Sequence, residues 1–291
     1  MIAQDLLGKP LAEKINNQTH LAAEELRQKG VVPRLAILDA TGDPASAAYA
    51  RTKMRLASSM GVEAQLVQAD NFLDTLQRVA ADPTIHAIFI ERPLPDYLGN
   101  KWMQYLPFSK DVEGELPLNL GRLVSRQSEE DFFYVPTTAL ACLEILKFYS
   151  IPISSQDIVI IGRSLTVGKP LSWLLLAEDA TVTICHTKTK DLASHTKRAK
   201  IIISAAGQRN LIDSSMISEG AILVDVGLTY TSDGSVYGDV NYEDVRHKAQ
   251  ALTPARGGLG PVTTALLLRN VIRAAQYATK APNILPLSFC L

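Results

Sequence analysis

The chain has 291 residues, of which 47% are apolar, so its length allows two hydrophobic cores and favours two domains. Its formal net charge of −1 argues against nucleic acid and against a membrane surface as partners. Three widely spaced cysteines and an N-terminus without a long apolar run predict a cytoplasmic protein that has no disulfide framework, zinc site, secretory signal or membrane span.

Helices and strands alternate in the first 90 residues. Apolar positions at helical spacing predict a surface helix over 10–29, and Gly30 ends it. Strands that alternate with helices indicate a parallel α/β sheet. The predicted strands cover 33–40, 62–67 and 85–90, and the predicted helices between them cover 46–60 and 71–81.

Turn-forming residues dominate 107–123 (PFSKDVEGELPLNLGRL), so this segment is predicted to be a loop. Its carboxylates are suited to a heterocycle with adjacent N–H donors, although Lys110, Asp111 and Glu113 could equally form a solvated charge cluster. A helix that links two domains is predicted over 134–149, with Pro136 and Thr137 as candidates for its N-cap.

A βαβ unit is predicted over 158–189. Gly162 interrupts an apolar strand, and Pro170 fixes the start of the following helix. A phosphate could bind there, because the first-turn N–H groups of a helix have no intrahelical partner. The dinucleotide fingerprint G-x-G-x-x-G is absent, so an ordinary α/β crossover is the alternative.

Two more strands and a long helix complete the chain. The strands are predicted at 199–207 and 221–227, and each ends at a glycine. The helix lies within 253–280 and carries a continuous apolar stripe, and its length lets it recross the domain boundary. A loosely ordered coil is expected from Pro282 onward.

The string GRSLTVGKP at 162–170 resembles the coenzyme loop of the bifunctional methylenetetrahydrofolate dehydrogenase/methenyltetrahydrofolate cyclohydrolase family. This resemblance implies a folate domain at 1–135, a Rossmann-like NADP-binding domain with a parallel sheet at 136–262, and a helix and tail at 263–291 that return to the first domain. It also implies a homodimer through the coenzyme domain. Further motifs extend the resemblance over nearly the whole chain: GDPASAAYARTK at 42–53, PLP at 93–95, KDVEG at 110–114, ATVTICHTKT at 180–189, VDVG at 224–227, GDV at 238–240 and GGLGPVTTALLLRN at 257–270.

The resemblance also implies which residues serve the folate. Tyr49 and Lys53 match the motif S-x-x-Y-x-x-x-K, whose tyrosine stacks on folate and whose lysine serves the chemistry; spacing alone indicates only a surface pair. Glu113 matches the second acid of K-D-V-D-G and is one methylene longer. The implied catalytic residues are Lys53, Tyr49 and Glu91, and the implied substrate-binding residues are Tyr49, Asp111, Glu113, Gly257, Gly258 and Pro261.

Several positions depart from the family pattern. The family's Q-L-P-L-P becomes Glu91-Arg92-Pro93-Leu94-Pro95, which places a carboxylate where an amide is expected. We expect Glu91 to pair with Lys53 and favour its charged form, which would depress the cyclohydrolase reaction relative to the dehydrogenase reaction. The alternative is that Glu91 pairs with Arg92. The family's P-C-T-P-x-G is also reduced here, with Ala139 at the position of its second proline.

The coenzyme is expected to be NADP. An NAD site usually places an acid about 20 residues after the glycine turn, but 186–190 (HTKTK) contain none, and Arg163 adds a cation suited to a 2′-phosphate. His186 receives no role. The expected coenzyme-binding residues are Gly162, Arg163, Ser164, Val167, Gly168, Thr187, Gly207 and Gly227.

Together these patterns predict an NADP-dependent enzyme that oxidises methylenetetrahydrofolate in one-carbon metabolism and uses no metal. Two alternatives stay open. One is a catalytically weak paralogue that binds folate or a nucleotide, and the other is a two-domain dehydrogenase that acts on a different substrate.

Overall fold

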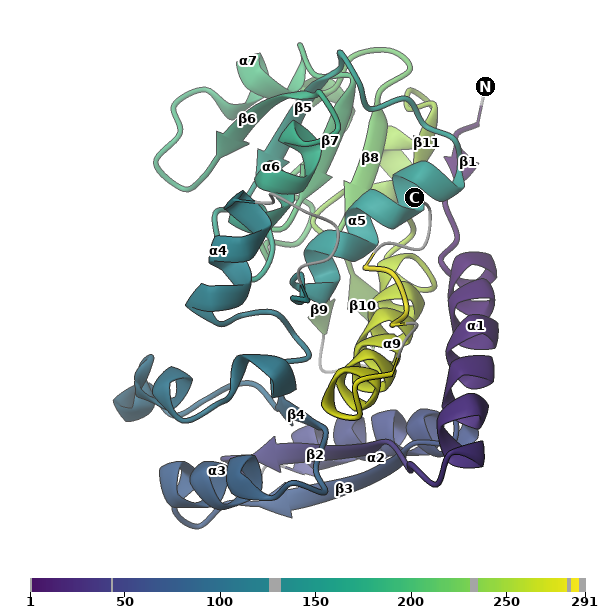
Figure 1. Cartoon of the computed structure of the whole chain (residues 1–291). Coiled ribbons are helices and arrows are strands. Elements are labelled where there is room, and N and C mark those ends of the chain that lie inside the picture. Colours follow the sequence, from purple (N-terminus) through teal and green to yellow (C-terminus); the bar gives the residue numbers. More distant parts are fainter. Residues whose placement is uncertain (1, 43, 126–131, 231–234, 282–283, 288–291) are drawn as a thin grey trace. The chain divides into compact units, whose positions relative to one another are not determined.

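The computed structural model describes residues 2–42, 44–125, 132–230, 235–281 and 284–287, with the side chains of all of these except 44–46, 48, 49 and 230 (Figure 1). The chain forms two compact units. The first, here the six-stranded unit, consists of the described residues within 2–13 and 136–263. The second, the three-stranded unit, consists of residues 14–135 and 264–287.

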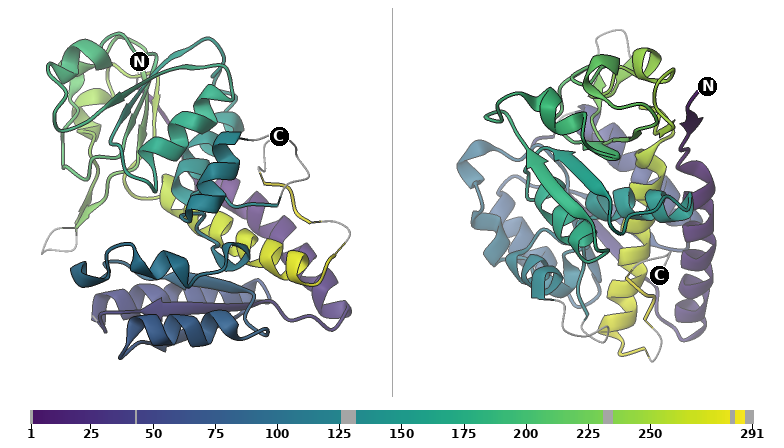
Figure 2. Two further views of the ribbon diagram at one scale, coloured as in Figure 1. Left: turned by 60° about the vertical axis from the view of Figure 1, so that its left-hand side comes forward. Right: turned by 90° about the horizontal axis from the view of Figure 1, so that it is seen from above.

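The three-stranded unit is built on a parallel sheet with the strand order β3-β2-β4. Alternate residues of β2 face opposite sides: Leu35 and Ile37 join one apolar core, whereas Ala36 and Leu38 join another. Helices α2 and α3 contribute to opposite cores (Figure 2). The elements are β2 (Arg34–Asp39), α2 (Pro44–Ser59), β3 (Glu63–Gln68), α3 (Phe72–Ala81), β4 (Ala87–Ile90), the 3-10 helices η1 (Asp96–Leu98), η2 (Lys101–Gln104) and η3 (Phe108–Lys110), and α4 (Pro117–Ser125).

The six-stranded unit contains a wholly parallel sheet with the strand order β1-β11-β8-β7-β5-β6. Strands β6 and β7 lie on either side of β5, so the direction of winding reverses there, and ligands of such sheets bind at this switch point. The elements are β1 (Gln4–Asp5), α5 (Thr137–Phe148), β5 (Asp157–Ile161), α6 (Gly168–Leu176), β6 (Thr181–Cys185), α7 (Leu192–Thr196), β7 (Ile201–Ser204), η4 (Ser214–Met216), β8 (Ile222–Asp225), the pair β9 (Thr229–Tyr230) and β10 (Val236–Tyr237), α8 (Tyr242–Val245) and β11 (Ala251–Leu252).

Two long helices, α1 (Lys9–Gln28) and α9 (Leu259–Ala278), contribute residues to both units. The C-terminal part of α9 supplies Leu267, Val271 and Ile272 to the core that contains Leu35 and Ile37. The expected return of this helix to the first domain is therefore confirmed. The expected coil after it needs a correction, because Arg273 of α9 donates to the Leu285 carbonyl at 3.0 Å and holds this part of the tail; residues 282–283 and 288–291 lie outside the described part.

Two expectations are wrong in detail. Residues 2–13 belong to the six-stranded unit and not to the folate domain, because β1 pairs in parallel with β11. The expected loop at 107–123 contains α4, which begins at Pro117 and buries Leu120 and Leu123 on one side. Of the two candidates for the N-cap of α5, Pro136 is the N-cap, and Thr137 lies within the helix.

Candidate active site

A buried ion pair lies at the carboxyl ends of the three-stranded sheet. The Lys53 Nζ, on α2, donates to both carboxylate oxygens of Glu91, at 3.0 and 2.8 Å. Glu91 follows the last residue of β4 directly, and both side chains are buried. The predicted pair is present, and the alternative pairing of Glu91 with Arg92 is not what the structure shows, since Arg92 bonds Glu115.

Two opposing influences act on the Lys53 ammonium. Burial is the larger one and lowers its pKa below the ordinary value, whereas the hydrogen bond and the charge of Glu91 raise it. The ammonium also lies 4.2 Å from the centroid of the Phe89 ring, which favours its charged form. The charge at position 91 therefore opposes the lowering that burial imposes on the Lys53 pKa.

A second ion pair joins Arg92 to Glu115. The Arg92 guanidinium donates to the Glu115 carboxylate and lies 5.3 Å from the centroid of the buried Trp102 ring. Glu115 is almost completely buried, whereas 44% of the Arg92 side chain is exposed. A sequence pattern gave no sign of this pair, because it joins the end of β4 to a loop more than 20 positions away whose path depends on the fold.

Asp111 organises the loop that follows η3. Its carboxylate accepts hydrogen bonds from the backbone N–H groups of Glu115 and Leu116, at 3.2 and 2.8 Å, and from the Asn119 amide at 2.7 Å. Burial raises the pKa of Asp111 to about 7. All of these donors belong to the same chain segment, which favours a role in holding the loop over direct contact with substrate.

Glu113, in contrast, accepts no side-chain hydrogen bond within the described part of the chain, and it is half-buried. Burial raises the pKa of Glu113 well above its ordinary value, Glu115 and Asp111 raise it further, and Lys53 and Arg92 oppose them. A carboxylate in this position could accept two N–H groups from the edge of a heterocycle.

Tyr49 cannot be placed in the same detail. Helix α2 puts its backbone one turn before Lys53, so the two residues share a helix face. The Tyr49 side chain lies outside the described residues, as does that of Ser46.

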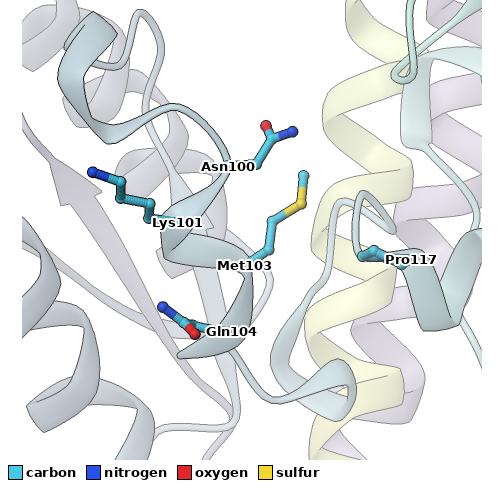
Figure 3. Close-up of a pocket in the computed structure, with 5 residues that line it drawn as sticks. All are labelled: Asn100, Lys101, Met103, Gln104 and Pro117. Carbon is cyan, nitrogen blue, oxygen red and sulfur yellow. The ribbon is translucent and has the colours of Figure 1, made fainter.

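A pocket of about 600 Å³ opens beside η2 in the same unit (Figure 3). Asn100 and Met103 point toward Pro117 at the start of α4, whereas Lys101 and Gln104 point to the other side. No sequence motif marks these residues. Trp102 and Glu115, which Arg92 contacts, are close in sequence to the lining residues Met103 and Pro117.

The glycine turn at the switch point is tightly packed. Gly162 has φ 121°, and a Cβ on it would lie 2.4 Å from the carbonyl oxygen of Ala205. A Cβ on Gly168 would lie 2.0 Å from the carbonyl oxygen of Gly162. The Ser164 hydroxyl accepts the Val167 N–H at 3.1 Å and so closes the turn.

The first turn of α6 offers few N–H donors to a phosphate. The Lys169 N–H already donates to the Ser164 carbonyl at 3.1 Å, and Pro170 has no N–H. A phosphate at this edge would depend on the N–H groups of the turn itself.

Arg163 and Thr187 follow neighbouring strands. Ile161 pairs with Cys185 at the ends of β5 and β6, and each residue stands two positions beyond its strand's last paired residue. Both are exposed. The side chains expected to recognise the coenzyme's ribose therefore start from one edge of the sheet.

Asp239 and Asp225, to which the sequence analysis assigned no role, hold the chain at the ends of β7 and β8 through hydrogen bonds. Asp239 accepts the N–H groups of Ala206, Gly207 and Gln208, at 2.6, 3.2 and 2.8 Å, and the Ser204 hydroxyl at 2.9 Å. The motif GDV contained the signal. These four bonds fix the loop that carries Gly207.

Asp225 does the same for the end of β8. It accepts the N–H groups of Gly227, Asp239 and Val240, at 3.0, 3.0 and 2.9 Å. Burial raises the pKa of Asp225 to about 7. A Cβ on Gly227 would lie 2.0 Å from an Asp239 oxygen, so the position requires glycine.

The six-stranded unit contains the three expected substrate-binding residues around the start of α9. Two of them, Gly257 and Gly258, precede the helix, and Pro261 lies in its first turn. Gly257 has φ 80°, and its carbonyl accepts the Gly8 N–H at 2.8 Å. Lys53, Glu91, Asp111 and Glu113 belong to the other unit. Within the described residues, no cluster of His, Cys, Asp or Glu could hold a metal ion, and no helix is long and apolar enough to cross a membrane.

These features define a class of two-domain α/β proteins in which a Rossmann-like parallel sheet carries a glycine turn at its switch point and a second α/β unit carries charged side chains. The chain belongs to the tetrahydrofolate dehydrogenase/cyclohydrolase family. The family's catalytic domain matches residues 6–113, and its NAD(P)-binding domain matches residues 136–279.

Known relatives cover nearly all of the chain. The bifunctional protein FolD 1 of Frankia casuarinae is 45% identical over 276 residues, which are 93% of this chain and 98% of the relative. The crystal structure of the bifunctional enzyme FolD, methylenetetrahydrofolate dehydrogenase/cyclohydrolase, from Campylobacter jejuni is 35% identical, with a TM-score of 0.89 over 94% of this chain and 99% of that one. The Trypanosoma brucei enzyme, whose structure was solved with NADP and an inhibitor, is 30% identical, with a TM-score of 0.88 over 97% of this chain and 100% of that one.

Proposed function

We propose that the protein oxidises methylenetetrahydrofolate to methenyltetrahydrofolate with NADP as the oxidant. The observation that carries this proposal is the Lys53, Glu91 and Glu113 cluster at the carboxyl ends of the strands, within a chain that matches both domains of the family. The folate nitrogens stabilise the cation that forms when hydride leaves the methylene carbon. The protein's main contribution is therefore to orient the reactants.

Glu113 is assigned to the pterin end of the substrate and Tyr49 to stacking on the folate. Glu113 suits this role because its carboxylate has no hydrogen-bond donor among the described residues, so pterin N–H groups would satisfy it. Asp111 would hold the loop that presents Glu113.

The residues at the switch point fit NADP. The Gly162 turn lets backbone approach closely, and Arg163 offers a guanidinium for the 2′-phosphate without an acidic residue in 186–190 to repel it. Bound NADP supplies the nicotinamide ring that accepts the hydride. Ser164, Val167, Gly168 and Thr187 would form the rest of this binding surface, with Gly207 and Gly227 at the ends of neighbouring strands.

The cyclohydrolase activity should be low relative to the dehydrogenase activity. To accept a proton from the attacking water, Lys53 must spend time neutral, and Glu91 opposes this by stabilising the ammonium through two hydrogen bonds. Hydride transfer has no such requirement and should be less affected.

The decisive assay follows absorbance while the purified protein is mixed with methylenetetrahydrofolate and either NADP or NAD, and then follows the fate of the methenyl product. Reduction of NADP with slow loss of the methenyl compound is the expected result. If neither coenzyme is reduced, the catalytically weak paralogue becomes the better description; reduction with another substrate alone would favour a different dehydrogenase.

We further propose a cytoplasmic homodimer formed through the six-stranded unit. The buried thiols of Cys142 and Cys185 suit a reducing compartment. Sedimentation at several protein concentrations tests the dimer, and a monomer at all concentrations would contradict it.

A further inference from the structure

The Arg92–Glu115 pair stands beside the proposed substrate-binding carboxylate. Arg92 occupies the position at which the family motif Q-L-P-L-P has leucine, so its charge is a departure of this chain. Glu115 is two positions after Glu113 in the same loop and is almost completely buried. Its buried charge is compensated by the Arg92 guanidinium.

The charges around Glu113 come from three elements. Lys53 on α2 and Arg92 after β4 favour its ionised form, whereas Glu115 and Asp111, on its own loop, oppose ionisation. Glu91 forms an ion pair with Lys53, and its negative charge offsets part of the attraction between Lys53 and Glu113. Arg92 thus acts in two ways, by attracting the Glu113 carboxylate directly and by neutralising Glu115.

We propose that Arg92 is a positioning residue for folate binding: by pairing with Glu115 it offsets a negative charge in the surroundings of Glu113, so that Glu113 more readily becomes the anionic acceptor for substrate N–H groups. The ring of Trp102 stacks on the guanidinium and fixes its place, while the exposed part of Arg92 keeps the pair in contact with solvent. This inference rests on the proposed assignment of Glu113 to the substrate.

The test compares the parent protein with Arg92→Leu, Arg92→Lys, Glu115→Gln and the double variant Arg92→Leu/Glu115→Gln. Infrared spectra recorded over a range of pH, with those of Glu113→Gln subtracted, report the protonation of Glu113 without any ligand. Calorimetry with tetrahydrofolate over the same pH range reports binding. The double variant is the critical control, because it removes both charges of the pair together.

Arg92→Leu should raise the pH at which Glu113 loses its proton and weaken tetrahydrofolate binding near neutral pH by up to about tenfold for each unit of that change. The weakening should fade at higher pH. Arg92→Lys should resemble the parent, the double variant should recover most of the loss, and Glu115→Gln should move the Glu113 midpoint downward.

An unchanged Glu113 midpoint in Arg92→Leu, or a double variant as weak as the single one, would overturn the proposal. So would a loss of binding that is equal at every pH, since that result indicates a purely structural role. If Arg92→Leu does not fold, the Glu115→Gln variant decides: a downward shift of the Glu113 midpoint supports the proposal, and an upward shift or none overturns it. If the parent protein binds no tetrahydrofolate at any pH but the Glu113 midpoint still shifts in the variants, the proposed function is wrong, whereas the effect of Arg92 and Glu115 on Glu113 is confirmed.

Discussion

At position 91 this chain has glutamate where the family motif has glutamine, and the Glu91 carboxylate raises the pKa of Lys53. At a separation near 4 Å and an effective dielectric near 20, two opposite charges attract by about 4 kcal/mol before the cost of desolvation. A third of that energy corresponds to about one pKa unit. Glu91 therefore offsets part of the lowering that burial imposes on the Lys53 pKa.

Glu91→Gln should accordingly increase the rate of methenyltetrahydrofolate hydrolysis relative to methylenetetrahydrofolate oxidation. Without the carboxylate, burial would lower the Lys53 pKa further, so more of the lysine would be neutral at a given pH. Comparing both rates in the parent, Glu91→Gln and Glu91→Asp measures this, because aspartate keeps the charge. A parent that already hydrolyses rapidly, or a glutamine variant that is no faster, would contradict the argument.

Glu113→Ala should weaken tetrahydrofolate binding by about 1–3 kcal/mol, because pterin N–H donors would lose their acceptor. Isothermal calorimetry measures this loss. Glu25→Ala, which removes an exposed carboxylate of α1, serves as the matched control and should bind as the parent does. Equal affinity in Glu113→Ala and the parent would show that the pterin binds elsewhere.

Arg163→Ala should weaken NADP binding and leave NAD binding nearly unchanged, since only NADP carries the 2′-phosphate that a guanidinium would recognise. Dissociation constants for both coenzymes provide the measurement. Arg78→Ala, an exposed arginine of α3, is the control for a general loss of positive charge. A parent protein with equal affinity for both coenzymes would refute NADP selectivity.

The site was only partly predictable from single residues. The Lys53–Glu91 contact followed from matching two family motifs; Glu91 directly follows β4, whereas Lys53 lies on α2, the helix after β2. The partner of Arg92 did not follow, because Glu115 reaches it only through the path of the loop that Asp111 holds. The motifs VDVG and GDV contain Asp225 and Asp239, but motif matching did not predict which backbone N–H groups these aspartates bind.

At the scale of elements, hydrophobic periodicity predicted most helices and strands with boundaries close to those observed. Very short elements were missed, because β1 and β11 have only two residues each and carry no measurable period. Helix α4 was missed for a different reason: its proline, asparagine and glycine are typical of turns, and only the buried side of the helix compensates for them.

Gly168→Ala tests how the glycine turn and α6 fit together. The new Cβ would lie 2.0 Å from a carbonyl oxygen of the backbone, so the turn must move, and both stability and NADP binding should fall. Urea unfolding and coenzyme titration measure the two effects. Gly121→Ala in α4 is the matched control: nothing lies within 4 Å of the new Cβ, so the variant should be stabilised by about 0.5–1 kcal/mol.

At the scale of the whole molecule, each unit has its own apolar core and one of the two tryptophans, with Trp102 in the three-stranded unit and Trp173, on α6, in the six-stranded unit. Fluorescence can therefore follow the two units separately in variants that retain one tryptophan. The core shared by β2 and α9 provides a mutation site that belongs to one unit only.

Ile272→Ala should destabilise the three-stranded unit by about 2–5 kcal/mol, since it opens a cavity in a fully buried position. The urea midpoint reported by Trp102 should fall more than that reported by Trp173. Ile202→Ala on β7 is the matched control and should give the reverse order. Equal shifts of both signals in both variants would show that the units unfold as one.

In both units, segments from the N-terminal part of the chain pack against residues near its C-terminus, and this affects folding during translation. Strands β2, β3 and β4 leave the ribosome early, yet Leu267, Val271 and Ile272, which complete one of their cores, are among the last residues translated. The six-stranded sheet likewise waits for β11 before β1 can pair. Such distant partners slow folding and leave apolar surface uncovered in the nascent chain, so this polypeptide should engage chaperones until translation is nearly finished.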